Sequence, residues 1–270
     1  MSKRNSQASK SAARERLRAE RERQAKKDRT RRQVVVGVSV VAALAIIGGG
    51  AYGVMQLNKP GHWDAAKDAK NVTAPKNTSG TDGTTVVIGK STAKKTLELY
   101  EDSRCPVCAQ FEQTVGETVH KDVDAGKYKV KYIGATFIDS NGGEGSKNAL
   151  SALGAALNVS PEAFLDYKYA LYSAKYHPEE TDDKFKDDSY LIKVADTVDA
   201  LKGNDAFQKN VKDGTYDAWA MKMSATFDKS GVEGTPTLKM NGKALTASDN
   251  KNAPMTVADF NTAITAALKA

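Results

Sequence analysis

Two cysteines, Cys105 and Cys108, are the residues whose type and spacing offer the clearest chemistry in this chain. Only Pro106 and Val107 separate them, and the 270 residues contain no other cysteine. A pair at this spacing could bind a metal ion, close a short structural disulfide, or cycle between a dithiol and a disulfide. The surrounding sequence must distinguish these three possibilities.

A metal site and a structural bridge are both poorly supported. A zinc site normally has four ligands, so two thiolates would need partners from His62, His120 and His177. No two of these histidines have ligand spacing, and we therefore predict no metal site. A disulfide that closes so short a loop restricts the unfolded chain little, which weakens the structural interpretation. We favour a redox pair.

The predicted elements around the cysteines suit redox chemistry. The segment "KTLELY" (95–100) is typical of a strand, and from Cys108 onward apolar residues recur at steps of three and four until near Gly126. A helix that starts at Cys105 would stabilise a thiolate there through free N–H groups and the helix dipole, and Pro106 suits its first position. Cys108 falls on the buried face. We predict that Cys105 is the nucleophile and Cys108 the resolving thiol.

The remaining patterns indicate an α/β domain without internal repeats. "TTVVIG" (84–89) and "KYKVKYI" (127–133) are predicted strands, and residues 144–230 show helical periodicity. Two short strands surround Asn241-Gly242, the strongest short hairpin signal, and a last helix follows Thr256. The order is therefore β-β-α-β, a helical block, a β-hairpin and a helix.

Three features carry a resemblance to a known family: the order of the elements, the Cys-x-x-Cys after the second strand, and the segment "GVEGTPTLKMNGK" (231–243). Through them, residues 84–270 resemble the DsbA-like branch of the thioredoxin superfamily. The resemblance implies a thioredoxin-like α/β fold with a central mixed sheet and a helical subdomain inserted at about 144–230. It also implies that Pro236 is a cis-proline facing the redox-active pair, and that the backbone of Thr235 binds an extended substrate peptide.

The resemblance also implies that nearby residues tune the reactivity of the two cysteines, and we place Pro106 and Val107 among them. Strongly oxidising relatives often carry a histidine where this chain has Val107, and thioredoxin has a buried carboxylate where this chain has Leu99. Asp102 matches an acidic position common in these proteins and is expected to be a turn or cap residue. Without the two familiar tuning groups, we expect the pKa of Cys105 to lie below the free value of about 8.5, but less depressed than in the most oxidising relatives.

The N-terminal region has the pattern of a membrane anchor. Residues 1–33 have a net charge of +9, more than the +7 of the whole chain, and residues 34–55 carry no charge. An apolar helix of this length spans a bilayer core. The apolar region of a cleavable signal peptide, the rival interpretation, is typically shorter, about 7–15 residues. We predict a retained transmembrane helix at 34–57, with the basic tail cytoplasmic and later residues outside.

The regions on either side of this helix are predicted to lack a fold of their own. Residues 58–83, rich in Pro, Gly, Asn, Thr and Lys, are expected to form a flexible linker to a domain that begins near Thr84. The basic tail (1–33) has no aromatic residues for stacking on bases, so we expect it to contact anionic lipid headgroups and not nucleic acid.

Together these patterns predict a single-pass membrane protein whose extracytoplasmic domain donates disulfides to cysteine-containing exported proteins, without a cofactor. The resemblance implies a membrane partner of the DsbB or vitamin K epoxide reductase type that resets the pair. A disulfide reductase or isomerase of the same fold remains an alternative, as does a non-enzymatic module that binds peptide or metal. The acidic loop 177–188 keeps the metal variant open, although its carboxylates lack the spacing of a known calcium loop.

Overall fold

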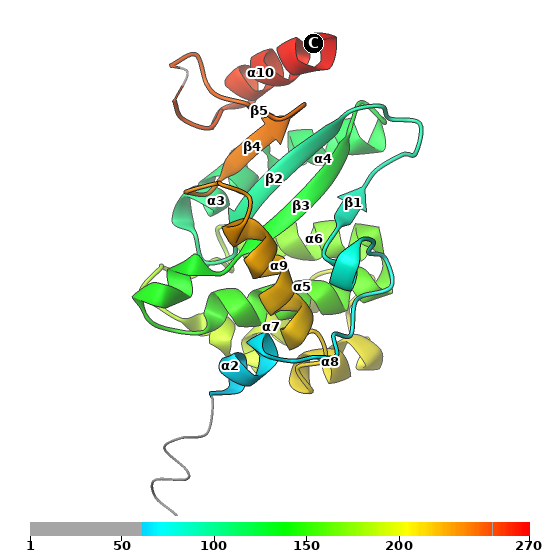
Figure 1. The fold of residues 1–270 in the computed structure, drawn as a ribbon, viewed down its shortest axis with the longest axis vertical. Coiled ribbons are helices and arrows are strands. Elements are labelled where there is room, and N and C mark those ends of the chain that lie inside the picture. The colour runs from blue at the N-terminus through cyan, green and yellow to red at the C-terminus, as the bar shows by residue number, and fades with distance from the viewer. Residues whose placement is uncertain (1–60, 250) are drawn as a thin grey trace, which may run out of the picture. The chain divides into compact units, whose positions relative to one another are not determined.

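A five-stranded mixed sheet forms the centre of the fold (Figure 1). The computed structural model describes residues 61–249 and 251–270. The strands are β1 (Val86–Ile88), β2 (Thr96–Asp102), β3 (Lys129–Ala135), β4 (Thr237–Met240) and β5 (Lys243–Ala244), in the order β1-β3-β2-β4-β5. Strands β2 and β3 are parallel, and the other neighbours are antiparallel. The predicted mixed sheet is therefore confirmed.

Strand β2 is the central strand and carries the chain into the cysteines. Its neighbours β3 and β4 pair with it on both sides. Leu97, Leu99 and Glu101 lie on the same face of the sheet, because side chains two residues apart in a strand point the same way. Because both faces are covered by helices, even the last two residues of the strand, Glu101 and Asp102, are buried.

One helical run follows the cysteines, as the apolar stripe predicted. It consists of α3 (Pro106–Phe111), a π-helical segment η2 (Glu112–Gly116) and α4 (Glu117–Asp124). Its apolar side packs with the last helix, α10 (Val257–Lys269), in a core that includes Leu97, Leu99 and an edge-to-face Phe111–Phe260 ring contact with centroids 6.3 Å apart. This core fixes the start of α3 against β2.

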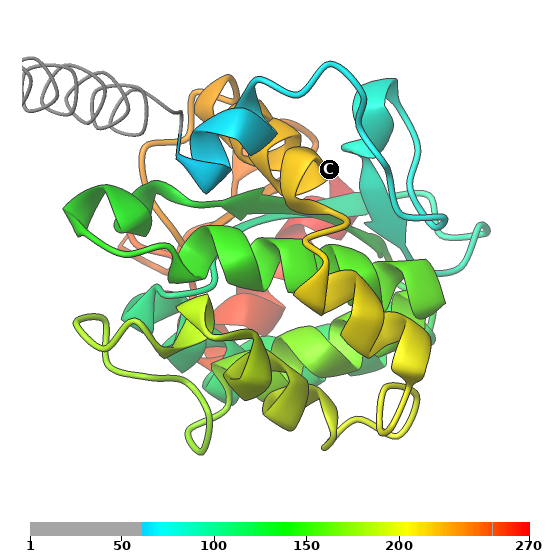
Figure 2. The ribbon, with the colours of Figure 1, turned by 90° about the horizontal axis from the view of Figure 1, so that it is seen from below.

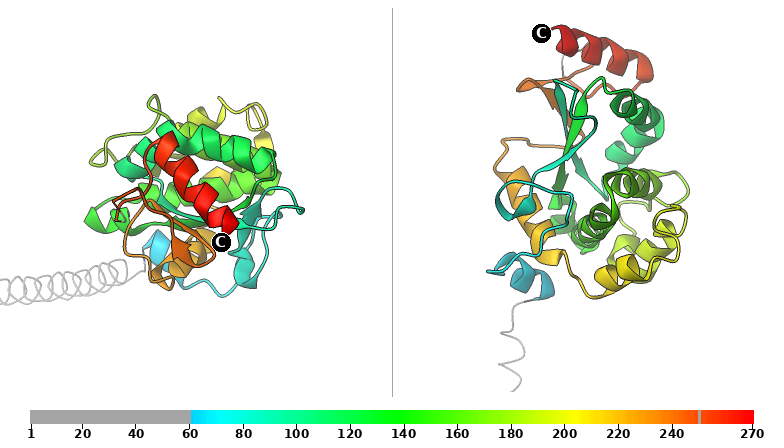
Figure 3. Two further views of the ribbon diagram at one scale, coloured as in Figure 1. Left: turned by 90° about the horizontal axis from the view of Figure 1, so that it is seen from above. Right: turned by 90° about the vertical axis from the view of Figure 1, so that its right-hand side faces the viewer.

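The inserted helices follow β3. They are the short η3 (Phe137–Asn141), then α5 (Gly145–Val159), α6 (Pro161–Tyr172), η4 (Lys184–Lys186), α7 (Asp188–Ala195), α8 (Asp205–Lys212) and α9 (Asp217–Asp228). Ser160 caps α6 through its side chain and Pro161 occupies the first turn. In Figure 1 most of this group lies at one end of the sheet, Figure 2 shows the molecule from that end, and Figure 3 shows α10 at the opposite end.

The β4–β5 hairpin turns at the predicted dipeptide. Asn241 and Gly242 have φ values of 55° and 76°. A two-residue turn of the favoured hairpin type requires positive φ at both central residues, which Asn and Gly tolerate best. The hairpin returns the chain to the sheet edge after the loop that contains Pro236.

Residues 61–83 are the described part of the predicted flexible linker, and they differ from that prediction because they contain helices and pack on the domain. They include α2 (His62–Lys67) and the short η1 (Thr81–Gly83). Trp63 is buried, the Asn77 side chain donates to the Leu157 carbonyl at 2.7 Å, and the Trp219 indole donates to the Gly83 carbonyl at 2.8 Å. The segment is polar in composition, but one tryptophan and a few side-chain hydrogen bonds hold it on the domain. The folded unit begins at Gly61.

Within residues 61–249 and 251–270, no helix has both the length and the apolar character needed to cross a bilayer. The predicted tail (1–33) and transmembrane helix (34–57) lie outside the described residues, so both stay predictions.

Candidate active site

Cys105 lies where β2 has ended and α3 begins. Its backbone is extended (φ −72°, ψ 116°), its N–H donates to the Asp102 carbonyl at 2.9 Å, and Pro106 occupies the first turn. The Cys105 Sγ accepts a hydrogen bond from the Cys108 N–H at 3.3 Å, so the sulfur itself caps the helix. This is the helix-start position that the sequence predicted for the nucleophile.

The loop before β4 brings two further predicted residues to this sulfur. The Thr235–Pro236 peptide bond is cis. The Cys105 thiol lies 3.5 Å from the Thr235 carbonyl oxygen, although 130 positions separate the two residues in the chain. The cis bond and this contact thus bring the backbone of Thr235 to the Cys105 sulfur.

The surroundings of Cys105 favour its thiolate. Its pKa is lowered to about 6, chiefly by the hydrogen bond from the Cys108 thiol. Burial acts in the opposite direction, whereas the Thr235 side chain and the N–H groups of Cys108 and Val107 lower the pKa further. The depression that we expected from the helix start is present, and several donors add to the helix effect.

Cys108 has the opposite character. It is completely buried, and burial raises its pKa well above the ordinary value, with further contributions from Cys105 and from the charge of Glu101. Between these two pKa values the pair holds one proton, on Cys108. The dithiol therefore presents one nucleophilic sulfur next to one protonated, covered sulfur, which is the arrangement that thiol-disulfide exchange requires.

A buried charge cluster near Cys108 was not predicted from the sequence. The Lys168 Nζ lies 2.9 Å from Glu101 Oε2 and 2.6 Å from Glu112 Oε1, and all three side chains are almost wholly buried. Burial raises the pKa of Glu101 well above its ordinary value, against the lowering effect of Lys168. Leu99 does occupy the position of the carboxylate in thioredoxin, but nothing in the sequence indicated that Glu101, two residues later in the same strand, places a buried carboxyl group near Cys108 and raises its pKa.

Sequence signals for this cluster existed. Glu112 stands one turn after Cys108 on the apolar stripe, and Lys168 stands between Phe164 and Leu171 on the buried face of its helix. Charged residues on a buried helical stripe are rare unless they are paired. Their partner Glu101 could not be found by spacing, since it comes from a strand.

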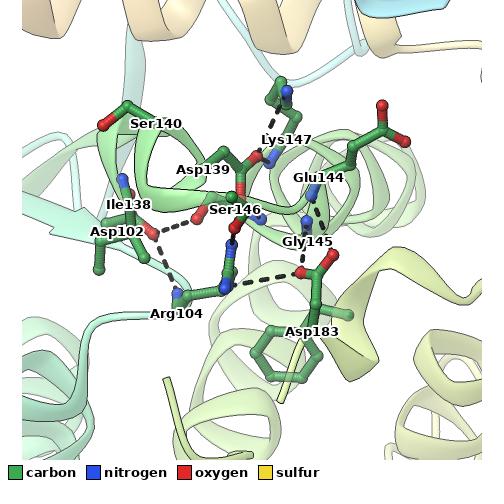
Figure 4. A network of polar contacts seen from close by, with 12 residues as sticks. Asp102, Arg104, Ile138, Asp139, Ser140, Glu144, Gly145, Ser146, Lys147 and Asp183 are labelled. Carbon is green, nitrogen blue, oxygen red and sulfur yellow. Dashed lines mark hydrogen bonds and ion pairs between the residues drawn. The ribbon is translucent and has the colours of Figure 1, made fainter. Parts of the chain in front are cut away.

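A second polar network holds the turn that precedes Cys105 (Figure 4). The Asp102 carboxylate accepts hydrogen bonds from the Arg104 N–H at 3.0 Å, the Ile138 N–H at 3.1 Å and the Ser146 hydroxyl at 2.6 Å. Burial raises the pKa of Asp102 to about 6. The expected role of Asp102 as a turn residue agrees with these contacts, which also fasten the turn to the start of α5.

Arg104 connects the same turn to the acidic loop 177–188. Its guanidinium donates to Asp139 Oδ1 at 2.8 Å and to the Glu180 carbonyl at 2.8 Å, and its Nε lies 3.5 Å from Asp183 Oδ1. The His177 Nε2 lies 3.1 Å from the Ser103 carbonyl oxygen. Part of this loop is thus held next to the active-site turn by these contacts. No group of three His, Cys, Asp or Glu side chains in the part of the chain that the structure describes is arranged to hold a metal ion.

Val107 is 48% exposed, next to the nearly covered Cys105. It provides an apolar surface on one side of the nucleophile, and its side chain offers the sulfur no hydrogen bond. Its N–H group nevertheless contributes to the low pKa of Cys105. The predicted tuning position thus acts on the sulfur through its backbone.

Comparison with known proteins places this geometry in a family. A sequence model of the family described as thioredoxin matches residues 81–266. The chain belongs to this family. Disulfide bond formation protein D of Bacillus subtilis is 24% identical over 160 residues, which cover 59% of this chain and 68% of that protein. The solved structure of reduced DsbA from Mycobacterium tuberculosis has a TM-score of 0.54 at 26% identity, and the match covers 68% of this chain and all of that one.

The family match also extends to a larger protein. Serine/threonine-protein kinase PknE of Mycobacterium tuberculosis is 26% identical over 157 residues, which cover 56% of this chain but only 27% of the kinase. The predicted DsbA-like relationship and the predicted enzyme class, a thiol-disulfide oxidoreductase, are both confirmed by the relatives and solved structures.

Proposed function

We propose that this chain donates disulfides to cysteine-containing exported proteins, from a membrane-anchored domain outside the cytoplasm, through Cys105 and Cys108. The observation that carries the proposal is the division of one proton between two neighbouring sulfurs: the pKa of Cys105 is lowered to about 6, and that of Cys108 is raised. A stabilised Cys105 thiolate stabilises the reduced protein, which makes the disulfide form a better oxidant.

The reaction follows from the position of the two sulfurs. A substrate thiolate attacks Cys105 Sγ of the Cys105–Cys108 disulfide, whose bond breaks, and the electron pair goes to Cys108. The substrate is now bound to Cys105 as a mixed disulfide. A second substrate thiolate attacks the substrate sulfur of that bond, which releases an oxidised substrate and the Cys105 thiolate. Cys105 is a good leaving group in this step because its pKa is low.

The entrance to Cys105 supports an extended peptide as substrate. Thr235 and Pro236 lie on one side of the sulfur, and the exposed Val107 lies next to it in the chain. This surface offers backbone and small apolar contacts, which suit many unrelated sequences. Broad acceptance of exported proteins is what we expect of such an entrance.

The location and the partners in this proposal rest on the sequence. The basic residues 1–33 and the apolar helix predicted at 34–57 support a domain on the outer side of the cell membrane, where disulfides persist. A membrane protein of the DsbB or vitamin K epoxide reductase type would accept the electrons that Cys105 and Cys108 have taken up. In this proposal, the helix at 34–57 anchors the protein in the bilayer.

Two measurements on the full-length chain in detergent test the proposal. The reduction potential against glutathione buffers should lie closer to the value of about −120 mV typical of DsbA than to about −270 mV for thioredoxin. A value near that of thioredoxin would favour a reductase. The Cys108→Ala variant should also trap exported proteins as mixed disulfides through Cys105, whereas a Cys105→Ala, Cys108→Ala double variant should trap none. No trapped protein, together with no turnover of a model disulfide, would favour a binding module.

A further inference from the structure

The residue before the nucleophile is an arginine in a domain that otherwise uses lysine. Residues 61–270 contain 25 lysines but only one arginine, Arg104. Its side chain is only 5% exposed. A guanidinium presents five N–H donors in a planar fork, which the single ammonium of a lysine cannot reproduce. The shape of this side chain, and not only its charge, therefore matters next to Cys105.

The guanidinium connects two loops that are far apart in the chain. One is the acidic loop, and the other is the η3 loop, residues 137–143. In the η3 loop, Nη1 of Arg104 donates to Asp139 Oδ1 at 2.8 Å and to the Gly142 carbonyl at 2.9 Å (Figure 4). In the acidic loop, Nη2 donates to the Glu180 carbonyl at 2.8 Å. One side chain thus sets the distance between the two loops.

The chain has no side chains where the guanidinium and its partner Asp183 approach it most closely. A Cβ atom at Gly143 would lie 2.7 Å from Nη1 of Arg104, and one at Gly145 would lie 2.5 Å from Asp183 Oδ1. Real Cβ atoms do not come this close to other heavy atoms. Gly143 also has a φ of 105°, which glycine adopts readily. Glycine at these two positions therefore lets the loops close around Arg104.

Both loops adjoin the surroundings of the nucleophile. Ile138 in the η3 loop belongs to the buried cluster that contains Cys105 and Cys108. The His177 Nε2 in the acidic loop lies 3.1 Å from the Ser103 carbonyl oxygen. A hollow of about 430 Å³ lies between the two loops. Its lining includes Arg104, Asn141, Gly142, Gly143, Glu180 and Thr181.

We propose that Arg104 is a positioning residue for polypeptide substrates. It holds the η3 loop and the acidic loop apart at a fixed distance, so that the hollow between them is ready to receive substrate residues near the reactive cysteine. Because Arg104 and Cys105 are chain neighbours, a substrate bound at Cys105 reaches the hollow within a few residues. Backbone groups, an amide, a hydroxyl and a carboxylate line the hollow, which suits polar segments of an unfolded exported protein.

The inference rests on the proposed function, because only a polypeptide substrate extends beyond its own sulfur into the hollow. A preformed hollow lowers the cost of binding, since the loops need not become ordered when the substrate arrives. The groups that lower the pKa of Cys105 are the Cys108 thiol, Thr235 and nearby N–H groups, whereas the Arg104 guanidinium is bonded to the loops. Loss of the fork should therefore weaken substrate binding and leave the sulfur chemistry intact.

The experiment compares a polypeptide with a small dithiol, using the full-length chain in detergent. Single-turnover reduction of the oxidised protein is measured with an unstructured peptide that carries two cysteines, and with dithiothreitol. Arg104→Lys keeps the charge but loses the fork, so the half-saturating peptide concentration should rise about tenfold, which corresponds to about 1.4 kcal/mol. The maximum rate with the peptide and the rate with dithiothreitol should stay unchanged.

Two further variants separate positioning from a general effect on the acidic loop. Asp183→Asn keeps Arg104 but weakens the contact of its Nε, 3.5 Å from Asp183 Oδ1, and should raise the half-saturating concentration by less than Arg104→Lys. Lys184→Met is the matched control. Lys184 is half exposed on the same loop, pairs with Asp182 at 2.8 Å and does not line the hollow. This variant should bind the peptide as the native protein does.

Three results would overturn the role of Arg104. They are an unchanged half-saturating concentration in Arg104→Lys, equal losses with peptide and dithiothreitol, and a loss in Lys184→Met as large as in Arg104→Lys. If Arg104→Lys does not fold, Asp183→Asn decides by the same measurements. Any of these results would leave the proposed function standing if Cys108→Ala still traps exported proteins, whereas a failure to trap would count against the function itself.

Discussion

The surroundings of Cys105 and Cys108 differ strongly although one helical turn separates them. Around Cys105 the contacts come from backbone N–H groups at the start of α3 and from the loop that holds Thr235. Around Cys108 they come from buried side chains on β2, η3 and α6, namely Glu101, Ile138 and Tyr172. The first set stabilises a negative sulfur, and the second set favours a neutral one.

The difference shows two ways in which a fold controls a reactive group. The Cys105 thiolate depends mainly on local structure, because the Cys108 thiol, its strongest donor, and the N–H groups of Val107 and Cys108 all lie within three residues of that sulfur. The Cys108 thiol depends on tertiary structure, because its neighbours meet only after the inserted helices have packed on the sheet. Local changes should therefore alter Cys105 mildly, and changes in the buried cluster should affect the whole domain.

The largest effect should come from removing the cation of the buried cluster. Lys168→Met leaves Glu101 and Glu112 without a counter-charge in the protein interior. Breaking a buried ion pair from one side typically costs about 3–5 kcal/mol. We expect a loss of this size in the free energy of unfolding of the reduced protein, measured by urea denaturation.

A surface lysine provides the control for this loss. Lys209 on α8 pairs with Asp213, the residue that follows the end of this helix, and most of the Lys209 side chain is in solvent. Lys209→Met should change the urea midpoint hardly at all. Equal stability of the Lys168→Met and native proteins would contradict the view that the region around Cys108 depends on buried charge.

A smaller effect should come from Thr235→Val. The Thr235 side chain lowers the pKa of Cys105, so its loss should raise that pKa and reduce the alkylation rate of Cys105 at pH 6 by less than about tenfold, the factor of one pKa unit. Thr226→Val is the control, because the Thr226 hydroxyl donates to the Lys222 carbonyl within α9 at 3.1 Å. A rate that is unchanged, or that rises, would show that backbone groups alone stabilise the thiolate.

Much of the Cys105 environment could be predicted from the sequence because it depends on nearby residues and on one motif. The strand, the helix start and Pro106 follow from local periodicity and helix-terminus rules. The cis bond at Pro236 followed from a family resemblance. The Asn241-Gly242 turn is equally local, since it depends on two residues that tolerate positive φ.

The Cys108 environment and the segment 61–83 could not be predicted in the same way. In the sequence Glu101 is an ordinary strand residue. Only the fold shows its role, because η2 and α6 bring Glu112 and Lys168 into one cluster with it. Residues 61–83 have the composition of a linker, and only their contacts with α5 and α9 make them part of the domain. In both cases the missing information is which distant elements meet.

The opposed acidities of the two sulfurs are most directly tested by alkylation of the reduced protein as a function of pH, with each cysteine identified by mass spectrometry. A lowered pKa means that the Cys105 thiolate forms as pH rises through about 6, so its reaction rate should climb there and become constant above about pH 7. Cys108 should stay unmodified in the folded protein up to pH 9. Equal reactivity of the two cysteines, or a Cys105 midpoint near the ordinary thiol value of about 8.5, would contradict this account.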